Sequence, residues 1–390
     1  MGNGRCDLSL HRVKVTLPDL LHNLRSPQEK VTITMDTTDA PQIIEHIHKS
    51  INYTPYDTKW VPCSARFVAM GIHPNAKGAL QVFQLNNGDL ELIADGKTSS
   101  GIKCGTFGAS FVEDRHIATG DHSGKLIIYD LEQIDKPIYE QQAHTSIVNA
   151  IDGCGGLDIG YGAPEIVTGG RDGCVRLWDP RVHEPVLALE PGEGQPVRDC
   201  WTVAFGNSYS DEDRCIVAGY DNGDVKLFDL RTNAIRYETN VANGVTSIEF
   251  DRKDIEMNKL AVTTLESKFR VFDMRTQHPT GGFTCLSEKA HKATVWCVRH
   301  LPQNRDLFMT GGGNGGFNLY KYHYPQNRTK MAKDNVPMGV VGTVELLNSR
   351  VISSQPIVSL DWSPDREGLC VLSCLDQTLR CYIVTKLNKY

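Results

Sequence analysis

Three short motifs contain residue types that could bind a metal or take part in catalysis. His46 and His48 lie two positions apart, which would place both imidazoles on one face of a strand, but no third ligand follows nearby. Gly311–Gly316 (GGGNGG) fits a dinucleotide-binding pattern, yet the next residues, FNLYKY, have the character of a strand rather than a helix. Gly120–Gly124 (GDHSG) has the wrong spacing for a nucleophilic serine. We therefore expect no catalytic residues, no cofactor and no metal, in a protein that is not an enzyme.

The cysteines and the charge balance favour the same conclusion. The chain has 12 cysteines without a CxxC pair, and the nearest two, Cys370 and Cys374, lack histidine partners at zinc spacing. The net charge of −6 does not supply the basic field that nucleic acid or a membrane surface would need. The start of the chain lacks the apolar segment of a secretory signal. We expect a cytoplasmic protein with reduced thiols, whose partners are proteins rather than nucleic acid or membranes.

A repeat organises the rest of the chain. Seven similar segments are centred on an aromatic residue, at intervals of 44 to 62 residues. They are LQVFQL (Phe83), LIIYDL (Tyr129), VRLWDP (Trp178), VKLFDL (Phe228), FRVFDM (Phe272), FNLYKY (Tyr320) and LRCYIV (Tyr382). Each follows an apolar strand and a Gly/Asp/Asn turn, and a further strand precedes each hairpin. The pattern predicts an all-β, seven-bladed WD40 β-propeller.

The last repeat predicts how the ring closes. It holds only three strands between Ile357 and Leu387, whereas Gln42–His48 precedes the first repeat as a surplus strand. Joining the two would complete blade seven and remove an exposed edge. We therefore expect an N-terminal extension over residues 1–40, without stable structure, and a propeller over residues 41–390.

One repeat contains all four polar residues that link a blade internally in this type of fold. These are His144, Thr168, Asp172 and Trp178, and His291 holds the place of His144 in a later repeat. Buried polar groups need partners, so we expect these residues to be structural.

The inner strands predict a binding surface on the narrow end of the channel. The position after the first apolar residue should point away from the packing between blades; it holds Tyr56, Lys103, Asn149, Trp201, Thr246, Trp296 and Val358. Exposed aromatic residues are typical anchors of interfaces, although these rings could instead pack between blades. The turn residues Arg171 and Asp221 should flank Trp201 and extend the surface.

A second set of exposed residues follows the repeat aromatics. WDPR, FDLR and FDMR end at Arg181, Arg231 and Arg275. Such an arginine can pair locally with acids. In substrate receptors of cullin-RING ubiquitin ligases the corresponding arginine contacts the ligase adaptor, so these three are possible adaptor contacts.

Two segments depart from the repeat. Gly153–Ala163 (GCGGLDIGYGA) is a glycine-rich insertion in blade three, shaped for binding or serving as a flexible connection. Residues 325–339 are polar and charged, and we expect a long surface loop there.

Several non-repetitive stretches resemble one WD-repeat family, the dynein axonemal assembly factors. They include PQIIEHIHK, KWVPCSARFV, RDCWTVAFGN, VFDMRTQHPT and VRHLPQNR, and the likeness runs across residues 41–390. The resemblance implies a cytoplasmic co-chaperone adaptor that supports the stability and preassembly of axonemal dynein heavy chains. Its implied partners are the R2TP complex, with RuvB-like ATPases and a tetratricopeptide-repeat subunit, and prefoldin-like subunits. It also implies a link to apoptosis.

Two alternative functions remain open. Arg181, Arg231 and Arg275 would suit a substrate receptor of a cullin-RING ligase. Tyr56, Trp201 and Trp296 could form an aromatic cage for a methylated protein tail.

Overall fold

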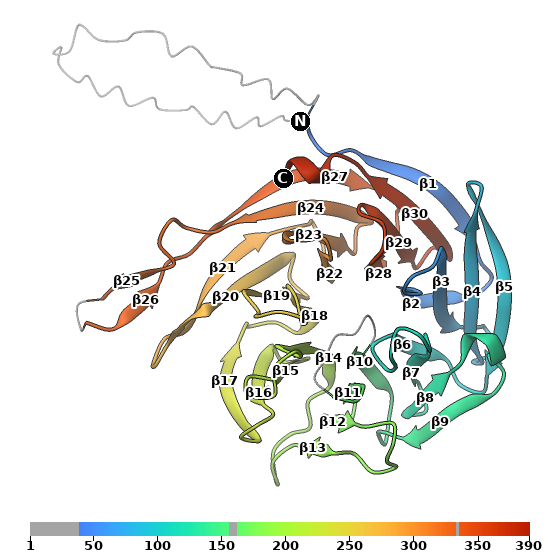
Figure 1. Cartoon of the computed structure of the whole chain (residues 1–390), viewed down its shortest axis with the longest axis horizontal. Coiled ribbons are helices and arrows are strands. Elements are labelled where there is room, and N and C mark those ends of the chain that lie inside the picture. The colour runs from blue at the N-terminus through green and yellow to red at the C-terminus, as the bar shows by residue number, and fades with distance from the viewer. Residues whose placement is uncertain (1–38, 156–161, 333–334) are drawn as a thin grey trace, which may run out of the picture. The chain divides into compact units, whose positions relative to one another are not determined.

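The computed structural model describes residues 39–155, 162–332 and 335–390, and these form seven four-stranded antiparallel sheets around a central axis (Figure 1). Blades one to three contain β2 (Thr54–Trp60), β3 (Arg66–Ile72), β4 (Gly78–Asn86) and β5 (Asp89–Thr98); β6 (Ile102–Thr106), β7 (Ile117–Asp121), β8 (Lys125–Tyr129) and β9 (Pro137–Gln142); β10 (Val148–Cys154), β11 (Glu165–Gly170), β12 (Val175–Trp178) and β13 (Leu187–Leu189). Blades four and five contain β14 (Cys200–Gly206), β15 (Cys215–Tyr220), β16 (Asp224–Asp229) and β17 (Ala234–Asn240); β18 (Val245–Phe250), β19 (Lys259–Thr264), β20 (Lys268–His278) and β21 (Gly282–Lys289).

Blades six and seven complete the ring. They contain β22 (Val295–Leu301), β23 (Asn304–Gly312), β24 (Gly316–His323) and β27 (Thr343–Val351); β28 (Ile357–Trp362), β29 (Leu369–Cys374), β30 (Thr378–Val384) and β1 (Ile43–Ser50). The predicted all-β, seven-bladed propeller is therefore confirmed. No helix in the described ranges is long and apolar enough to cross a membrane.

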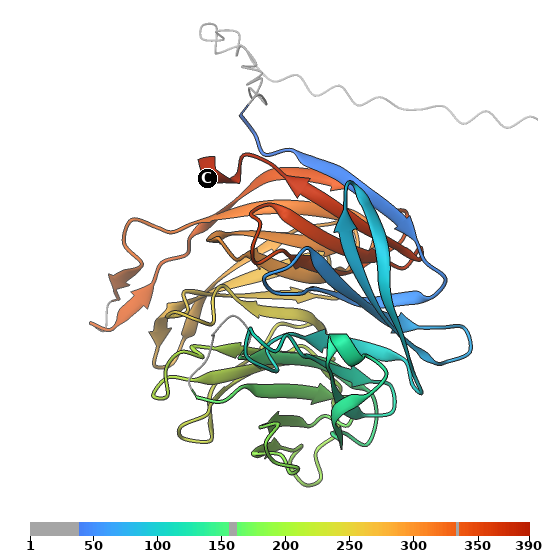
Figure 2. The ribbon, with the colours of Figure 1, turned by 45° about the vertical axis from the view of Figure 1, so that its right-hand side comes forward.

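The first strand of the described chain closes the ring, as the sequence predicts. β1 lies along β30 in both ribbon views (Figures 1 and 2) and pairs with it antiparallel, from Ile43 opposite Val384 to Ser50 opposite Thr378. Ile43 and Ile47 are buried beneath it, whereas Ile44 points outward and is 48% exposed. Arg350 of blade six also donates to the Ile43 carbonyl, at 2.7 Å from Nη1 to O. The seam therefore joins the two ends of the ring through a β-ladder.

The repeat aromatics form the core between blades. All seven are buried, with at most 7% of their surface exposed: Phe83, Tyr129, Trp178, Phe228, Phe272, Tyr320 and Tyr382. Phe83 of blade one, for example, packs in one cluster with Leu369 and Val371 of blade seven. Because each ring fills a contact with the neighbouring blade, the spacing of the aromatics sets the spacing of the blades.

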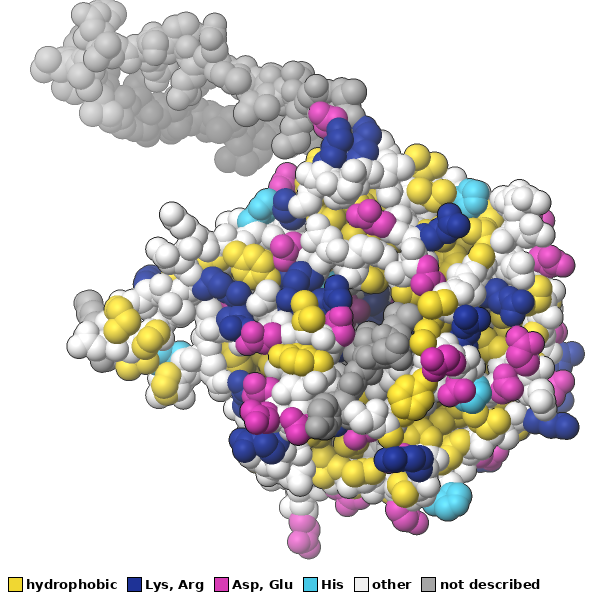
Figure 3. Space-filling view, viewed as in Figure 1, with side chains coloured by type: hydrophobic (Ala, Val, Ile, Leu, Met, Phe, Trp, Pro, Cys, Tyr) yellow, Lys and Arg dark blue, Asp and Glu magenta, His cyan; other side chains and the backbone are white. Residues whose placement is uncertain are grey.

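The segment 325–339 is not the plain loop that its polarity suggests. It contains a short hairpin, β25 (Thr329–Met331) and β26 (Pro337–Gly339), between β24 and β27. Arg328 fixes its base, because its guanidinium binds the buried Asp273 carboxylate and lies 4.6 Å from the ring centroid of Tyr324. The hairpin projects from the ring and carries apolar side chains in the space-filling view (Figure 3). Met331 and Met338 are its exposed large apolar residues.

The glycine-rich insertion is described only at its two ends. β10 extends to Cys154 and β11 begins at Glu165, while residues 156–161 lie outside the described residues. A Cβ atom on Gly153 would come within 2.5 Å of the Gly108 carbonyl carbon. Glycine at this end of the insertion is therefore needed for close backbone approach between blades two and three. The expected N-terminal extension, residues 1–40, falls outside the described residues except for its last two positions.

Candidate functional site

The seven inner strands enclose a channel of about 870 Å³, and each strand contains a β-bulge at the same place. The bulged residues are Tyr56, Lys103, Asn149, Trp201, Thr246, Trp296 and Val358, and all seven line the channel. A bulge leaves its extra residue out of the ladder and redirects its side chain. The structure thus gathers the predicted inner-strand positions into one ring, which we call the channel mouth.

Two members of the channel mouth brace neighbouring blades. Asn149 donates from Nδ2 to the Cys200 carbonyl oxygen at 3.1 Å, across the contact between blades three and four. The Thr246 hydroxyl donates to the Val295 carbonyl, across the contact between blades five and six. Both side chains have their hydrogen bonds within the fold and are less suited to bind a partner.

Four other members keep polar atoms free for a partner. Tyr56, Lys103, Trp201 and Trp296 are partly buried, and their side-chain polar atoms make no hydrogen bond or ion pair with the described residues. Each can donate: a phenol O–H, an ammonium and two indole N–H groups. The free hydrogen-bonding capacity of the mouth therefore consists mainly of donors.

Lys103 lies in a distinct environment within this ring. Its Nζ atom is 4.5 Å from the centroid of the Tyr56 ring. The centroid of the His122 ring is 5.5 Å from the same Tyr56 centroid. Burial lowers the pKa of Lys103, and the negative charge of Asp57 opposes that shift only in part. Burial and the nearby Lys103 charge lower the pKa of His122, which favours the neutral form of its ring.

The geometry does not favour an aromatic cage for a methylated tail. Tyr56, Trp201 and Trp296 come from β2, β14 and β22, in blades one, four and six, and no ring contact joins them within the described chain. Lys103 already occupies a face of Tyr56 and would repel a second cation. The rings are therefore dispersed around the mouth rather than gathered about one point.

Arg171 and Asp221 lie on the rim and do not line the channel. Arg171 Nε is 3.5 Å from the Asp199 carboxylate, and the backbone of Asp221 donates to the Asp199 carbonyl at 3.0 Å. The predicted pair is thus linked through Asp199 rather than by direct contact. A Cβ atom on Gly244 would lie 2.6 Å from the Asp221 carbonyl and 2.9 Å from the Trp201 ring, which places both beside that glycine.

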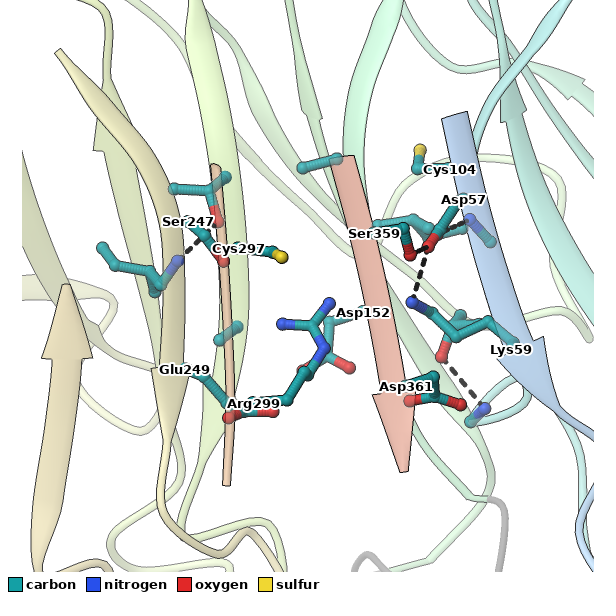
Figure 4. A pocket seen from close by; sticks show the side chains of 18 of the residues that line it. Asp57, Lys59, Cys104, Asp152, Ser247, Glu249, Cys297, Arg299, Ser359 and Asp361 are labelled. Carbon is teal, nitrogen blue, oxygen red and sulfur yellow. Dashed lines mark hydrogen bonds and ion pairs between the residues drawn. The ribbon is translucent and has the colours of Figure 1, made fainter. Parts of the chain in front are cut away.

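A charged ring deeper in the channel is absent from the sequence-based prediction (Figure 4). It occupies the position three residues after the bulge in five of the seven inner strands, where Lys59, Asp152, Glu249, Arg299 and Asp361 stand; the other two strands have Thr106 and Ala204 there. The three carboxylates accept backbone N–H groups of the next blade, at 2.9 Å from Phe205, 2.6 Å from His300 and 2.8 Å from Trp60 respectively. Extending the alignment of inner strands by three residues would have identified this ring.

Burial and neighbouring charges shift the pKa values of Asp361 in the ring and of Asp57 beside it. Burial raises the pKa of Asp361 to about 6, although Lys59 and Arg299 favour the ionised form. Burial opposes the ionisation of Asp57, but the charge of Lys59 and the hydrogen bond from Ser359 outweigh it and lower the Asp57 pKa. These carboxylates fasten blade to blade, which is a structural role.

The four polar residues of blade three form one hydrogen-bonded chain. His144 Nδ1 is 2.8 Å from Asp172, His144 Nε2 is 2.9 Å from the Thr168 hydroxyl, and Trp178 Nε1 donates to the same hydroxyl at 2.9 Å. In blade six, His291 Nε2 lies 2.8 Å from the Thr310 hydroxyl. Burial lowers the pKa of His291 to about 4, so it is neutral at physiological pH.

The three arginines after the repeat aromatics differ in their surroundings. The Arg181 side chain is 73% exposed and forms an ion pair with Asp179, with Nε 3.0 Å from both carboxylate oxygens. Arg275 pairs with Glu256. The exposed side chain of Arg231 has no hydrogen-bond or ion-pair partner among the described residues. Its backbone N–H donates to the Asp229 carboxylate.

Two of the motifs with possible chemistry border the channel mouth. The His122 ring of Gly120–Gly124 lies 5.5 Å from the Tyr56 ring, and a Cβ atom on Gly313 would lie 3.2 Å from Trp296 Nε1. His46 and His48 are exposed on β1, and no group of three potential metal ligands occurs in residues 39–155, 162–332 and 335–390. Gly311–Gly316 spans the turn between β23 and β24, as the sequence predicts.

Comparison with known proteins gives one consistent family. The family model "WD domain, G-beta repeat" matches residues 135–179. The chain is 59% identical over 356 residues to human dynein axonemal assembly factor 10, covering 91% of this chain and all of that protein. It is 55% identical over 357 residues to the Chlamydomonas reinhardtii protein of the same name, with 91% and 100% covered, and 24% identical to the Dictyostelium discoideum one over 366 residues, with 85% and 92% covered.

Proposed function

Because the chain belongs to the dynein axonemal assembly factor 10 family, we propose that it is a non-enzymatic scaffold for the assembly of axonemal dyneins. The observation that carries the proposal is the identity over the full length of the human relative. The propeller supports it, because a rigid ring with unpaired donors at its channel mouth suits the binding of protein segments.

In its finer form, the proposal is that of a cytoplasmic co-chaperone adaptor. It would hold axonemal dynein heavy chains and the R2TP and prefoldin-like subunits together before dynein is delivered to cilia. The binding residues we assign are the four donors of the channel mouth, Tyr56, Lys103, Trp201 and Trp296. Arg171 and Asp221 on the rim extend the same surface, and Asn149 and Thr246 support it.

The test is affinity purification of the full chain from ciliated cells. We expect co-purification of RuvB-like ATPases and dynein heavy chains, and loss of dynein heavy chains when the gene is deleted. Trp201→Ala with Trp296→Ala should reduce the recovery of partners. The matched control is Tyr209→Ala, since Tyr209 is an exposed aromatic that does not line the channel. Intact dynein arms after deletion would refute the proposal.

A ligase receptor is the competing function, and the unpartnered side chain of Arg231 is the observation that favours it. The same purification separates the two. Recovery of a cullin adaptor that disappears in Arg231→Glu would favour the receptor, whereas its absence from the wild-type sample would remove that alternative.

A further inference from the structure

The channel mouth has an unbalanced set of free groups, of which Tyr56 and Lys103 lie in blades one and two. Lys103 Nζ, the Tyr56 hydroxyl and the indole N–H groups of Trp201 and Trp296 are donors without acceptors in the described residues. Behind Tyr56, the Nε2 atom of His122 is buried and also lacks a hydrogen-bond partner. A partly buried ammonium without a counter-ion is costly, which makes this sector complementary to an anion.

The acids beside Lys103 are already occupied. Asp57 Oδ1 accepts from Lys59 at 2.9 Å and from the Ser359 hydroxyl at 2.6 Å, while its Oδ2 accepts from the backbone of Gly105 at 3.0 Å. Asp121, next to His122, accepts from the backbone of Ser123 and Lys125 and from the Ser123 hydroxyl. Asp57 is thus shared with Lys59, and neither carboxylate forms an ion pair with Lys103 within the described residues.

The same two acids limit the charge of the anion. Lys103 is the single cation among the seven residues of the mouth, and the ionised Asp57 lies one residue further along the channel from Tyr56. A carboxylate, with one negative charge, would match one ammonium. A phosphate dianion would bring a second charge toward Asp57, and the seven mouth residues hold no second cation to receive it.

The shape of the site favours a peptide over a free ion. The channel holds about 870 Å³, far more than one carboxylate needs, and the two indoles offer apolar faces and N–H donors at a distance from Lys103. Peptide carbonyls and apolar side chains can use those groups together.

From these observations we propose that the channel mouth binds an acidic peptide segment, with a side-chain carboxylate paired to Lys103. The proposal rests on the assignment of this mouth as the partner-binding surface above. It adds the chemistry of the partner, which is a segment bearing glutamate or aspartate between apolar residues.

The test uses the full chain and four pools of fluorescent octapeptides, with binding followed by fluorescence polarisation. The pools share apolar and aromatic flanking positions and differ at two central positions, which hold glutamate, glutamine, phosphoserine or lysine. We expect the glutamate pool to bind at least about tenfold more tightly than the glutamine pool, with the difference shrinking at high salt.

The variants then assign the charge to one residue. Lys103→Gln should lower the affinity for the glutamate pool to that for the glutamine pool, and Lys103→Arg should largely retain binding. Lys125→Gln is the control, because Lys125 lies in the same blade and already pairs with Glu140 at 2.6 Å. Thermal unfolding of each variant verifies that Lys103→Gln folds.

Equal affinity for the glutamate and glutamine pools, tighter binding of phosphoserine or lysine, or no binding by any pool would overturn the proposal. So would a loss of affinity in Lys125→Gln equal to that in Lys103→Gln. If one of these occurs while purification still depends on Trp201 and Trp296, the carboxylate assignment fails and the scaffold function stands. If that dependence is also absent, both fail.

Discussion

At the scale of single residues, Thr168 holds the most demanding position in the polar chain of blade three. Its hydroxyl is bonded to both His144 and Trp178, and all three side chains are buried. Thr168→Val keeps the shape but leaves two buried groups without partners, so we expect a loss of about 1–3 kcal/mol in the free energy of unfolding.

Blade two provides the control for that substitution. Thr119 is as deeply buried, but among the described residues its hydroxyl makes one hydrogen bond, to the Ile127 carbonyl at 3.1 Å. Thr119→Val should therefore cost less, about 1 kcal/mol, in urea denaturation of the full chain. Equal losses would mean that the chain of hydrogen bonds in blade three adds nothing beyond one buried hydroxyl.

Asp361 makes stability depend on pH in the opposite sense to most carboxylates. Burial raises its pKa in the folded protein to about 6, above the ordinary value of 3.8, so the folded state binds a proton more tightly than the unfolded state. Its contribution is most favourable below pH 3.8 and declines as pH rises through 6. Asp361→Asn should remove this part of the decline, which is a change on the order of 2 kcal/mol in the free energy of unfolding between pH 4 and 7.

The measurement is the difference in unfolding free energy between wild-type protein and Asp361→Asn at several pH values. An asparagine oxygen can still accept the Trp60 N–H, so the link between blades seven and one remains. A difference that does not vary with pH would contradict the prediction.

The sequence predicts which residues of the inner strands face the channel better than it predicts what those residues bind. The bulge position was identified in all seven inner strands, because apolar neighbours mark it in each repeat. That Asn149 and Thr246 brace the next blade could not be predicted, because their acceptors, the Cys200 and Val295 carbonyls, lie 51 and 49 residues away in sequence. The deeper ring was missed because its members share a position but not a residue type.

At the scale of elements, β1 should stabilise the fold mainly through the side chains on its buried face. Ile47 is 7% exposed and packs with Trp60, Phe67 and Leu379, whereas Ile44 is 48% exposed on the opposite face. Ile47→Ala should cost about 2–5 kcal/mol in unfolding free energy, and Ile44→Ala less than about 0.5 kcal/mol. Similar losses for both, measured by urea denaturation, would argue against the register of β1 on β30.

The two irregular elements show where sequence patterns suffice and where they fail. β1 was predictable because counting strands left blade seven one short. The hairpin β25–β26 was not, because Arg328 anchors it to Asp273, 55 residues away, and no local pattern reports that contact. Polar composition alone therefore suggested a loop.

At the scale of the whole unit that begins at Asp39, its first and last strands meet in one blade. Lys389 pairs with Asp39, and the backbone of Thr385 donates to the Gln42 carbonyl at 3.0 Å. A short linker can therefore join Tyr390 to Ala40, and new ends can be opened elsewhere. This arrangement allows the contribution of the shared blade to be measured without deleting any strand.

Two circular permutants separate the shared blade from the strands themselves. Opening before Thr54 makes blade seven continuous, so that blades seven and one are held by side-chain packing and by bonds such as Trp60 N–H to Asp361. Opening at Asn87–Gly88, in the exposed turn of blade one, keeps strands from both ends in one sheet. Separating the ends of the ring then requires breaking a β-ladder only in the second permutant.

We expect the first permutant to unfold about tenfold faster or more in urea, with the second close to wild type, since contacts that resist ring opening slow unfolding. Equal unfolding rates would show that packing between blades, rather than the shared sheet, keeps the ring closed.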